Sequence, residues 1–275
     1  MVVQHNLSAM NTSRQLSSVS SSMSKSTEKL SSGYKINRAA DDAAGLSISE
    51  KMRNQIRGLN KASDNAQDGI SLVQTAEGAL NEVHSMLQRM SELSVQAANG
   101  TNDTTDRSSI NDEIQQLKTE IERVGSTTQF NKMNILDGTF STGANKLLQV
   151  GANANQTIKI DIDALQSVVG SSLKGDLKTE TATNAQSAIT VVQSSIEKLS
   201  KLRSKLGAVQ NRLEHTVANL DNISENTQSS ESRIRDTDMA EEMVQYSKNN
   251  ILQQAGQSML AQANQANQGV LSLLQ

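Results

Sequence analysis

A seven-residue repeat of apolar positions organises the middle of the sequence. One series recurs every seven residues from Gly45 to Leu87, and a second follows three residues behind it, from Ile48 to Met90, with one clear polar exception. A repeat held over about seven heptads predicts a long helix packed in a coiled-coil-like bundle. At 1.5 Å per residue, a helix from about residue 42 to residue 98 would be about 80 Å long.

Two further apolar repeats predict partners for this helix. Residues 192–223 carry the same spacing of Val and Leu, and residues 110–124 carry a shorter version of it. The stretch ANGTNDTTD, which precedes the shorter repeat, is rich in residues that favour turns. Alternating isoleucines around a Gly-Ala-Asn turn follow the period-two pattern of strands, so residues 130–165 predict a small set of β-hairpins.

Both ends of the chain carry a narrow apolar stripe in a sequence that is otherwise Ser, Asn and Gln. The predicted seam positions are Val2, Ala9, Leu16, Met23 and Leu30 at one end, and Leu252, Met259, Ala263, Ala266, Val270 and Leu273 at the other. Helices with so little apolar surface are marginal alone. Either the two ends pair within the chain, or they become ordered only in an assembly. The small size of the stripe residues favours the second interpretation.

Together these patterns predict a mainly α fold. We expect a long coiled-coil-like helical bundle with a small β-hairpin region, and terminal helices paired in a coiled coil. Residues 1–41 and 236–275 would form a terminal helical domain. Residues 42–235 would form the bundle, with its β-hairpins at about 130–165.

Composition and charge exclude several classes of protein. The chain has no proline, the residue that breaks helices, and no cysteine, which excludes disulfides and cysteine-based sites. Its net charge of -3, with acids and bases interleaved, gives no basis for nucleic-acid binding. The sequence has no apolar run of about 18 residues, so we expect no membrane span. The N-terminus lacks the basic start, apolar run and cleavage site of a signal peptide.

The sequence offers no candidate for catalysis or for a cofactor. Its three histidines fit no metal-binding motif, and neither a nucleophile elbow nor a phosphate-binding loop occurs. Adjacent carboxylates such as Asp41 and Asp42 are more typical of helix caps. We therefore expect no enzyme activity, no cofactor and no metal site.

Five long segments resemble those of bacterial flagellin and occur in the same order. They are EKLSSGYKINRAADDAAGLSISEKMRNQIRGL (28–59), AQDGISLVQTAEGAL (66–80), LGAVQNRLEHTVANL (206–220), ESRIRDTDMAEEM (231–243) and NNILQQAGQSMLAQANQ (249–265). The resemblance implies a structural subunit that self-assembles through its terminal helices into the flagellar filament, for motility. In this family the paired termini form the inner filament core and a helical layer with a β-hairpin surrounds it. The short middle of the chain implies a minimal flagellin without outer variable domains.

The resemblance also implies a location and partners. It implies export by the flagellar secretion system, without a cleavable signal peptide, to an extracellular filament. The implied partners are further copies of the chain, an export chaperone, and hook-associated and cap proteins, with neither nucleic acid nor membrane. Asn267 stands where flagellins usually have a proline, which implies a straighter last helix.

Residues 87–103, LQRMSELSVQAANGTND, resemble the flagellin stretch that Toll-like receptor 5 of vertebrates recognises. Arg89, Leu93 and Glu113 match the receptor-contact positions of the family. Packing between subunits explains the same residues, and the two uses are compatible.

The segment GYKINRAADDAAGLSISEKMR (33–53) separates the weak N-terminal stripe from the strong repeat, and we interpret it as a joint. Gly33 permits a helix to end, and Asp41 or Asp42 can cap the next one. The alanines permit close approach of a neighbour. The candidates for charged contacts across a subunit boundary are Lys35, Arg38, Asp41, Asp42 and Glu50. A solvated hinge with a helix cap explains Gly33 and the aspartates but not the small residues.

Two alternative functions share parts of this pattern. A helical hairpin rich in Ala, Ser, Gln and Glu also describes the cytoplasmic part of a chemoreceptor, but the β-hairpins and the lack of a membrane span oppose it. A hook–filament junction protein shares the terminal helices of flagellin. The density of flagellin motifs in the bundle opposes that alternative.

Overall fold

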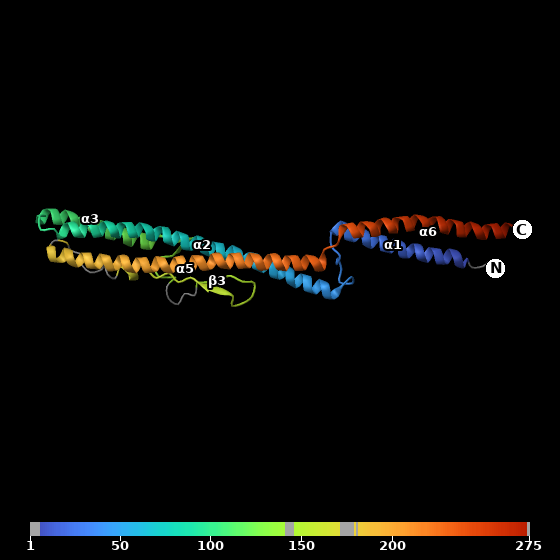
Figure 1. Ribbon diagram of the computed structural model, residues 1–275, viewed down its shortest axis with the longest axis horizontal. Coiled ribbons are helices and arrows are strands. Elements are labelled where there is room, and N and C mark those ends of the chain that lie inside the picture. Colours follow the sequence, from blue (N-terminus) through green and yellow to red (C-terminus); the bar gives the residue numbers. More distant parts are fainter. Residues whose placement is uncertain (1–5, 141–145, 171–178, 180, 274–275) are drawn as a thin grey trace. The chain divides into compact units, whose positions relative to one another are not determined.

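The computed structural model describes residues 6–140, 146–170, 179 and 181–273. Its elements are α1 (Leu7–Ser32), α2 (Ala43–Ala98), α3 (Thr104–Thr127), β1 (Gln129–Phe130), β2 (Met133–Asn134), β3 (Leu147–Gln149), β4 (Thr157–Lys159), the π-helix η1 (Gln166–Gly170), α5 (Ala182–Arg235) and α6 (Met239–Leu273). The structure confirms the predicted fold class: it is mainly α, with long helices, a small β-hairpin region and paired terminal helices (Figure 1). The last helix continues through Asn267 without a break.

Side-chain caps explain where two of the helices begin. Asn6 precedes α1, and its Oδ1 accepts a hydrogen bond from Ala9 N–H at 3.0 Å. Asp103 precedes α3 and forms a capping box with Asp106. Caps satisfy backbone N–H groups that have no partner inside the helix and are worth about 1 kcal/mol each. The predicted turn at ANGTNDTTD therefore contains the residue that starts the next helix.

The chain forms two compact units. Unit 1 contains residues 1–55 and 225–275, and unit 2 contains residues 56–224. The division lies inside α2 and α5, whereas the sequence predicted it at the ends of the terminal helices. Side chains explain the difference, because Ser49 Oγ donates to Glu231 Oε1 at 3.3 Å. The first turns of α2 are thereby joined to the last turns of α5 within unit 1.

Unit 2 contains the hydrophobic core. In this unit α2, α3 and α5 run alongside one another (Figure 1). The heptad positions of these helices are buried, including Leu80 and Leu87 in α2, Ile114 in α3, and Leu199 and Leu206 in α5. Full burial of one such side chain contributes about 1.5–3 kcal/mol. The apolar repeats of the sequence are thus the contacts that hold the bundle together.

The antiparallel hairpin of β3 and β4 lies against α2 where that helix carries glycine. Gly69 belongs to the heptad series, and a Cβ at this position would stand 2.5 Å from Leu148 Cδ2. At Gly58, a Cβ would stand 2.9 Å from the Cβ of Ala152. Real Cβ atoms do not approach other atoms so closely, so a side chain at position 58 would push the backbone at Ala152 away, whereas at position 69 the flexible Leu148 side chain would have to move.

Candidate functional site

In unit 1, the joint between α1 and α2 lies beside the joint between α5 and α6. Gly33 ends α1 in the left-handed conformation, with a φ of 76°, and its N–H donates to Lys29 O at 2.8 Å. Lys35 N–H donates to Arg235 O at 2.7 Å. Thr237 N–H donates to Gly33 O at 3.0 Å. Because a left-handed φ favours glycine, Gly33 both ends the helix and presents its carbonyl to the second joint.

The side chain of Arg235 connects the elements that meet at the joints. Its Nη1 donates to Glu50 Oε1 at 2.9 Å and to Ser49 Oγ at 3.4 Å. Its guanidinium lies over the ring of Tyr34, 4.7 Å from the centroid. The hydrogen bond from Arg235 lowers the pKa of Glu50, so this carboxylate is ionised at neutral pH. One side chain therefore joins the end of α5, the first turns of α2 and Tyr34 in the segment after α1.

Asp42 caps the N-terminus of α2, at the end of the joint between α1 and α2. Its Oδ1 accepts a hydrogen bond from Gly45 N–H at 2.9 Å, which satisfies a free N–H of the first helical turn. Gly45 is buried, and a Cβ at this position would meet the side chains of Asp42 and Ile36. Among the described residues, Ile36 is the only buried hydrophobic residue of unit 1. Gly45, a member of the predicted small-residue cluster, therefore allows close packing within the chain.

Asp41 and Arg38 are exposed, and both have partners within the chain. Asp41 Oδ2 accepts hydrogen bonds from the backbone N–H groups of Arg38 and Asn37, at 3.0 and 3.3 Å. The bond from Arg38 lowers the pKa of Asp41. Arg38 Nε donates to Glu28 Oε1 on α1 at 2.8 Å. These contacts fit the interpretation of the joint as a solvated hinge with a cap.

The helices α1 and α6 lie side by side in unit 1 (Figure 1). The half-buried or buried positions of α1 recur with a spacing of three and four residues at Ala9, Thr12, Leu16, Val19, Met23, Ser26 and Leu30. The predicted seam positions Ala9, Leu16, Met23 and Leu30 all lie on this face. Val2 lies outside the described residues. The face also includes Thr12 and the buried Ser26, so the contact is partly polar.

The face of α6 that meets α1 differs from the predicted stripe. Its half-buried positions are Glu242, Tyr246, Asn249, Asn250, Gln253, Gly256, Leu260 and Ala263. Of the predicted seam positions, Ala263 lies on this face, whereas Leu252 and Met259 are exposed beside the contact. The reason is the size of Gly256: a Cβ there would stand 3.2 Å from Leu16 Cδ1, so α6 turns its smallest residue toward α1. The predicted positions whose side chains lie outside the described part of the chain are Ala266, Val270 and Leu273.

The outer surface of α6 carries exposed large apolar side chains among polar ones. The exposed large side chains of this helix are Met239, Met243, Val244, Ile251, Leu252 and Met259. A groove between the two helices is lined by Leu16 and Val19 from α1 and has Leu252 and Met259 along it. Near one end of the pair, Lys29 Nζ lies 3.5 Å from Glu242 Oε2. An amphipathic helix normally turns its apolar face inward, as α1 does, whereas α6 leaves most of its large apolar side chains exposed.

The segment that resembles a receptor-recognition stretch lies on α2 and α3 in unit 2. Arg89 Nε donates to Glu113 Oε1 at 2.9 Å, and this ion pair links the two helices. Arg89 Nη1 lies 3.3 Å from Glu92 Oε2. Leu93 is only 2% exposed and packs in the core of the bundle. The structure brings Arg89 and Glu113 together at the surface and does not expose Leu93 beside them.

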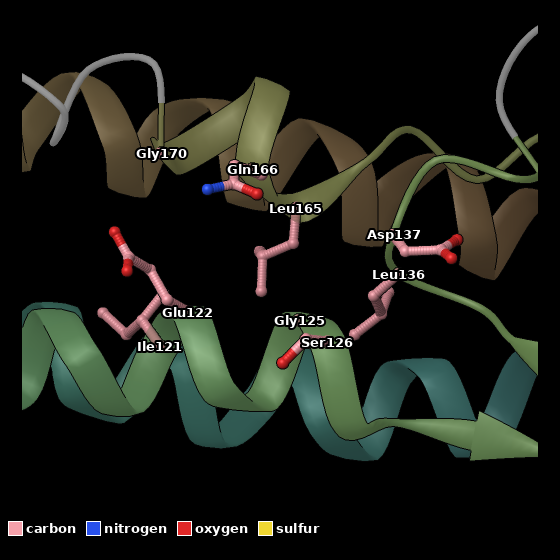
Figure 2. A pocket seen from close by; sticks show the side chains of 9 residues that line it. All are labelled: Ile121, Glu122, Gly125, Ser126, Leu136, Asp137, Leu165, Gln166 and Gly170. Carbon is pink, nitrogen blue, oxygen red and sulfur yellow. The ribbon is translucent and has the colours of Figure 1, made fainter.

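A small cavity of about 80 Å³ in unit 2 is bordered by α3, the turn after β2, and η1. Leu165 points into it, with Glu122 and Gln166 at its rim (Figure 2). Partial burial raises the pKa of Asp137, but hydrogen bonds from Thr139 outweigh this effect and the net pKa lies below the ordinary range. Ligand pockets usually enclose about 300 Å³ or more, so this cavity is too small for a metabolite.

The described part of the chain holds no group of three or more His, Asp or Glu that could bind a metal ion. No helix within the described ranges has the length and hydropathy needed to cross a membrane.

The sequence did not reveal the central position of Arg235 and its contact with Tyr34. The two residues are far apart in the chain and belong to no apolar repeat, so no periodic pattern connects them. A local signal does exist, since ESRIRDTD places cations at the end of one helix and acids at the start of the next. That signal predicts helix ends but not which side chains meet.

Two family profiles match the chain. The bacterial flagellin N-terminal helical region matches residues 3–141, and the bacterial flagellin C-terminal helical region matches residues 189–274. Together the matched ranges include both joints, α1, α2, α3 and α6.

Full-length relatives are similar to the chain from end to end. Flagellin of Halalkalibacterium halodurans is 56% identical over 275 residues, and the alignment covers 100% of both chains. Flagellin of Bacillus subtilis is 52% identical over 303 residues, again with 100% of both chains covered. The flagellar filament 33 kDa core protein of Treponema phagedenis is 50% identical over 285 residues, with the same coverage.

Solved structures resemble parts of the fold. The crystal structure of Bacillus cereus flagellin has a TM-score of 0.51 at 31% identity and covers 57% of this chain and 88% of that one. A putative flagellar hook-associated protein from Vibrio parahaemolyticus has a TM-score of 0.62 and covers 71% of this chain and 100% of that one. Its identity is 12%, so this second similarity concerns the fold alone.

Proposed function

The chain belongs to the bacterial flagellin family and is a structural subunit of the flagellar filament, not an enzyme; from this premise we propose how it assembles. Unit 2 folds by itself. The helices α1 and α6 pair weakly within one chain and become fully ordered only when neighbouring copies cover them. Assembly is then coupled to folding of the ends, and unit 2 is carried along as a preformed body.

The observation that carries this proposal is the poor burial of apolar side chains in unit 1. Ile36 is its only buried hydrophobic residue among those described, while α6 exposes six large apolar side chains. The contact between α1 and α6 contains Gln253, Asn249 and Gly256, which bury little apolar area. At about 25 cal/mol per Å² of apolar surface, such a contact does not offset the conformational entropy of ordering two long helices. Neighbouring copies would supply the missing burial.

Removal of the terminal helices tests this mechanism. Two truncated chains, one without residues 1–40 and one without residues 236–275, should be soluble, helical and monomeric. They should retain the cooperative unfolding transition of unit 2 and should form no filaments under conditions in which the full chain polymerises. Electron microscopy and circular dichroism provide the readouts. Filaments from either truncation would show that the paired ends are not the assembling element.

We also propose that the joint influences the shape of the filament. Gly33, Arg38, Asp41 and Asp42 all lie in the segment between α1 and α2, and Arg38 and Asp41 are exposed there. Removing the Arg38 side chain leaves the cap at Asp42 intact, so Arg38→Ala should alter filament shape or yield with little change in monomer melting temperature. Arg123→Ala, which removes a comparable exposed ion pair with Glu120 in unit 2, is the matched control. An equal effect of the two variants on filaments would remove any special role for the joint.

Recognition by Toll-like receptor 5 is a finer proposal that rests on family membership and on the surface around Arg89. The exposed pair of Arg89 and Glu113 offers a cation and an anion held in fixed positions between two helices. Leu93 would act by holding α2 in the bundle rather than by direct contact in this conformation.

A cell reporter for the receptor separates the contact role from the packing role. Arg89→Ala should lower receptor activation by the monomer at least about tenfold while its unfolding free energy changes by less than about 1 kcal/mol. Arg123→Ala should leave activation unchanged. If Arg89→Ala activates the reporter like the unaltered chain, this surface is not the recognition site.

On the same premise, the chain would be exported by the flagellar secretion system to an extracellular filament. An export chaperone and hook-associated or cap proteins would be its transient partners. The chemoreceptor alternative is incompatible with the family match. The junction-protein alternative has only a likeness of fold in its favour, whereas end-to-end relatives are flagellins and filament core proteins.

A further inference from the structure

The sulfur atoms of this chain are unevenly exposed. The sequence has no cysteine and ten methionines, so all of its oxidisable sulfur is thioether. Met90, in the core of unit 2, has no exposed surface. In contrast, Met10 and Met259 are 59% exposed and Met243 is 51% exposed. Oxidation of methionine follows access to the sulfur, so the terminal helices are the first to react.

The exposed thioethers coincide with the surface that assembly must cover. Met239, Met243 and Met259 lie on α6, and Met10 lies on α1. Met259 borders the groove between the two helices, on the same side as Leu16 and Leu252. In unit 2 the exposed methionine is Met133, whose sulfur accepts a hydrogen bond from Lys146 Nζ at 3.8 Å.

We propose that these terminal methionines are a redox-sensitive modification site that controls whether a free subunit can join the filament. The inference rests on the proposed function, because it assigns a regulation to the same assembling surface. A two-electron oxidant of the peroxide class converts the thioethers to sulfoxides while the subunit is free. The oxidised subunit remains folded in unit 2 but no longer adds to a filament.

The chemistry balances with hydrogen peroxide as the co-reactant. A sulfur lone pair attacks one peroxide oxygen, the S–O bond forms and the O–O bond breaks. The hydroxide that leaves takes up the proton of the transferred oxygen, and water is the product. Sulfur is oxidised by two electrons to the sulfoxide, and peroxide is reduced by the same two electrons.

The effect on assembly follows from the change in polarity. A thioether is soft and apolar and fits an irregular contact between helices. A sulfoxide carries a strong hydrogen-bond acceptor that loses water when the contact closes. Leaving even one such oxygen unpaired weakens subunit addition on the order of tenfold. Several oxidised positions on one pair of helices act together, so loss of addition should be nearly complete.

The first experiment treats the full-length monomer with graded hydrogen peroxide, removes the peroxide and adds filament seeds. Peptide mass spectrometry should show sulfoxide at Met10, Met239, Met243 and Met259 before any at Met90. Seeded elongation, followed by light scattering, should fall at least about tenfold at the dose that oxidises this set. The melting transition of unit 2 should not move. Elongation at the untreated rate by a monomer that carries these sulfoxides would overturn the inference.

The matched variant replaces all four methionines by leucine, a swap that keeps volume and removes sulfur. M10L/M239L/M243L/M259L should elongate seeds both before and after peroxide, whereas Met133→Leu alone should remain peroxide-sensitive. If the fourfold variant still loses elongation after peroxide, another position is responsible and the assignment is wrong.

If the fourfold variant fails to assemble, oxidation of preformed filaments of the unaltered chain provides the test instead. Peroxide applied to preformed filaments should leave Met243 and Met259 far less oxidised than in the monomer. Equal oxidation in both states would contradict the claim that assembly covers them. Failure of the untreated chain to elongate seeds would instead refute the proposed function, so the two failures are distinguishable.

Discussion

Unit 1 and unit 2 are built from similar long helices but bury their apolar side chains to very different extents. In unit 2 the heptad positions of α2, α3 and α5 form a closed core. In unit 1 the contact between α1 and α6 is partly polar, and the large apolar side chains of α6 face outward. Periodicity alone therefore does not make a stable helix pair. What matters is whether the chain itself covers the apolar stripe.

This difference assigns distinct tasks to the two units. A unit with a closed core is stable before assembly, and a unit with an open apolar surface is stabilised by assembly. The joint, where Arg235 meets Tyr34 and Glu50, lies within the weaker unit. Its contacts are consequently expected to matter most in the filament.

The largest expected effect comes from truncating the core of unit 2. Leu206 is fully buried, so Leu206→Ala should lower the free energy of unfolding by about 2–5 kcal/mol. Leu16→Ala on α1 removes the same atoms from a half-buried site and should change that free energy by less than about 1 kcal/mol. Urea unfolding of the monomers measures both. Similar losses in the two variants would mean that unit 1 is as well packed as unit 2.

An intermediate effect is expected from adding one methyl group to glycine in each unit. Gly33 has open space around it but a φ of 76°, so Gly33→Ala strains the backbone by about 1 kcal/mol. The critical concentration for polymerisation should rise about fivefold. Gly78 lies in helical backbone of α2, also with open space, so Gly78→Ala should stabilise unit 2 by about 0.5–1 kcal/mol. If both substitutions stabilise, Gly33 does not need its left-handed conformation.

The smallest expected effect is on the stability of the filament at acid pH. The hydrogen bond from Arg235 lowers the folded-state pKa of Glu50 below the ordinary 4.5. A carboxylate whose pKa is lower in the folded state stabilises that state at pH values above the ordinary pKa. This stabilisation is lost as the pH falls through the folded-state pKa. Glu50→Gln should therefore weaken filaments slightly near pH 7 and remove part of their sensitivity below about pH 4.5.

Glu120→Gln provides the control for that experiment. Arg123 lowers the pKa of Glu120 in the same way, but this pair lies on α3 in unit 2. Its loss should alter the acid unfolding of the monomer and leave the acid dissociation of filaments unchanged. A filament effect equal to that of Glu50→Gln would show that acid acts on any surface pair.

The sequence predicted the parts of the molecule whose packing follows a regular repeat of apolar residues. The helices of unit 2 follow from heptads because burial of Leu, Ile and Val in one seam is what forms them. The contact face of α6 was predicted only in part: Gly256 and Ala263 belong to the predicted apolar series, but Gln253 is polar and follows no apolar repeat. The burial of Leu93 could not be read from its match to a family position. Arg235 was missed because its partners come from distant segments.

Hydrogen–deuterium exchange of the free chain and of the filament tests the central claim most directly. Amides of α1 and α6 should exchange rapidly in the monomer, close to the rate of an unstructured chain, while those around Leu80 in α2 and Leu206 in α5 are strongly protected. In the filament, α1 and α6 should become as protected as the bundle. Strong protection of α1 and α6 already in the monomer would contradict the account, because the ends would then be ordered without neighbours.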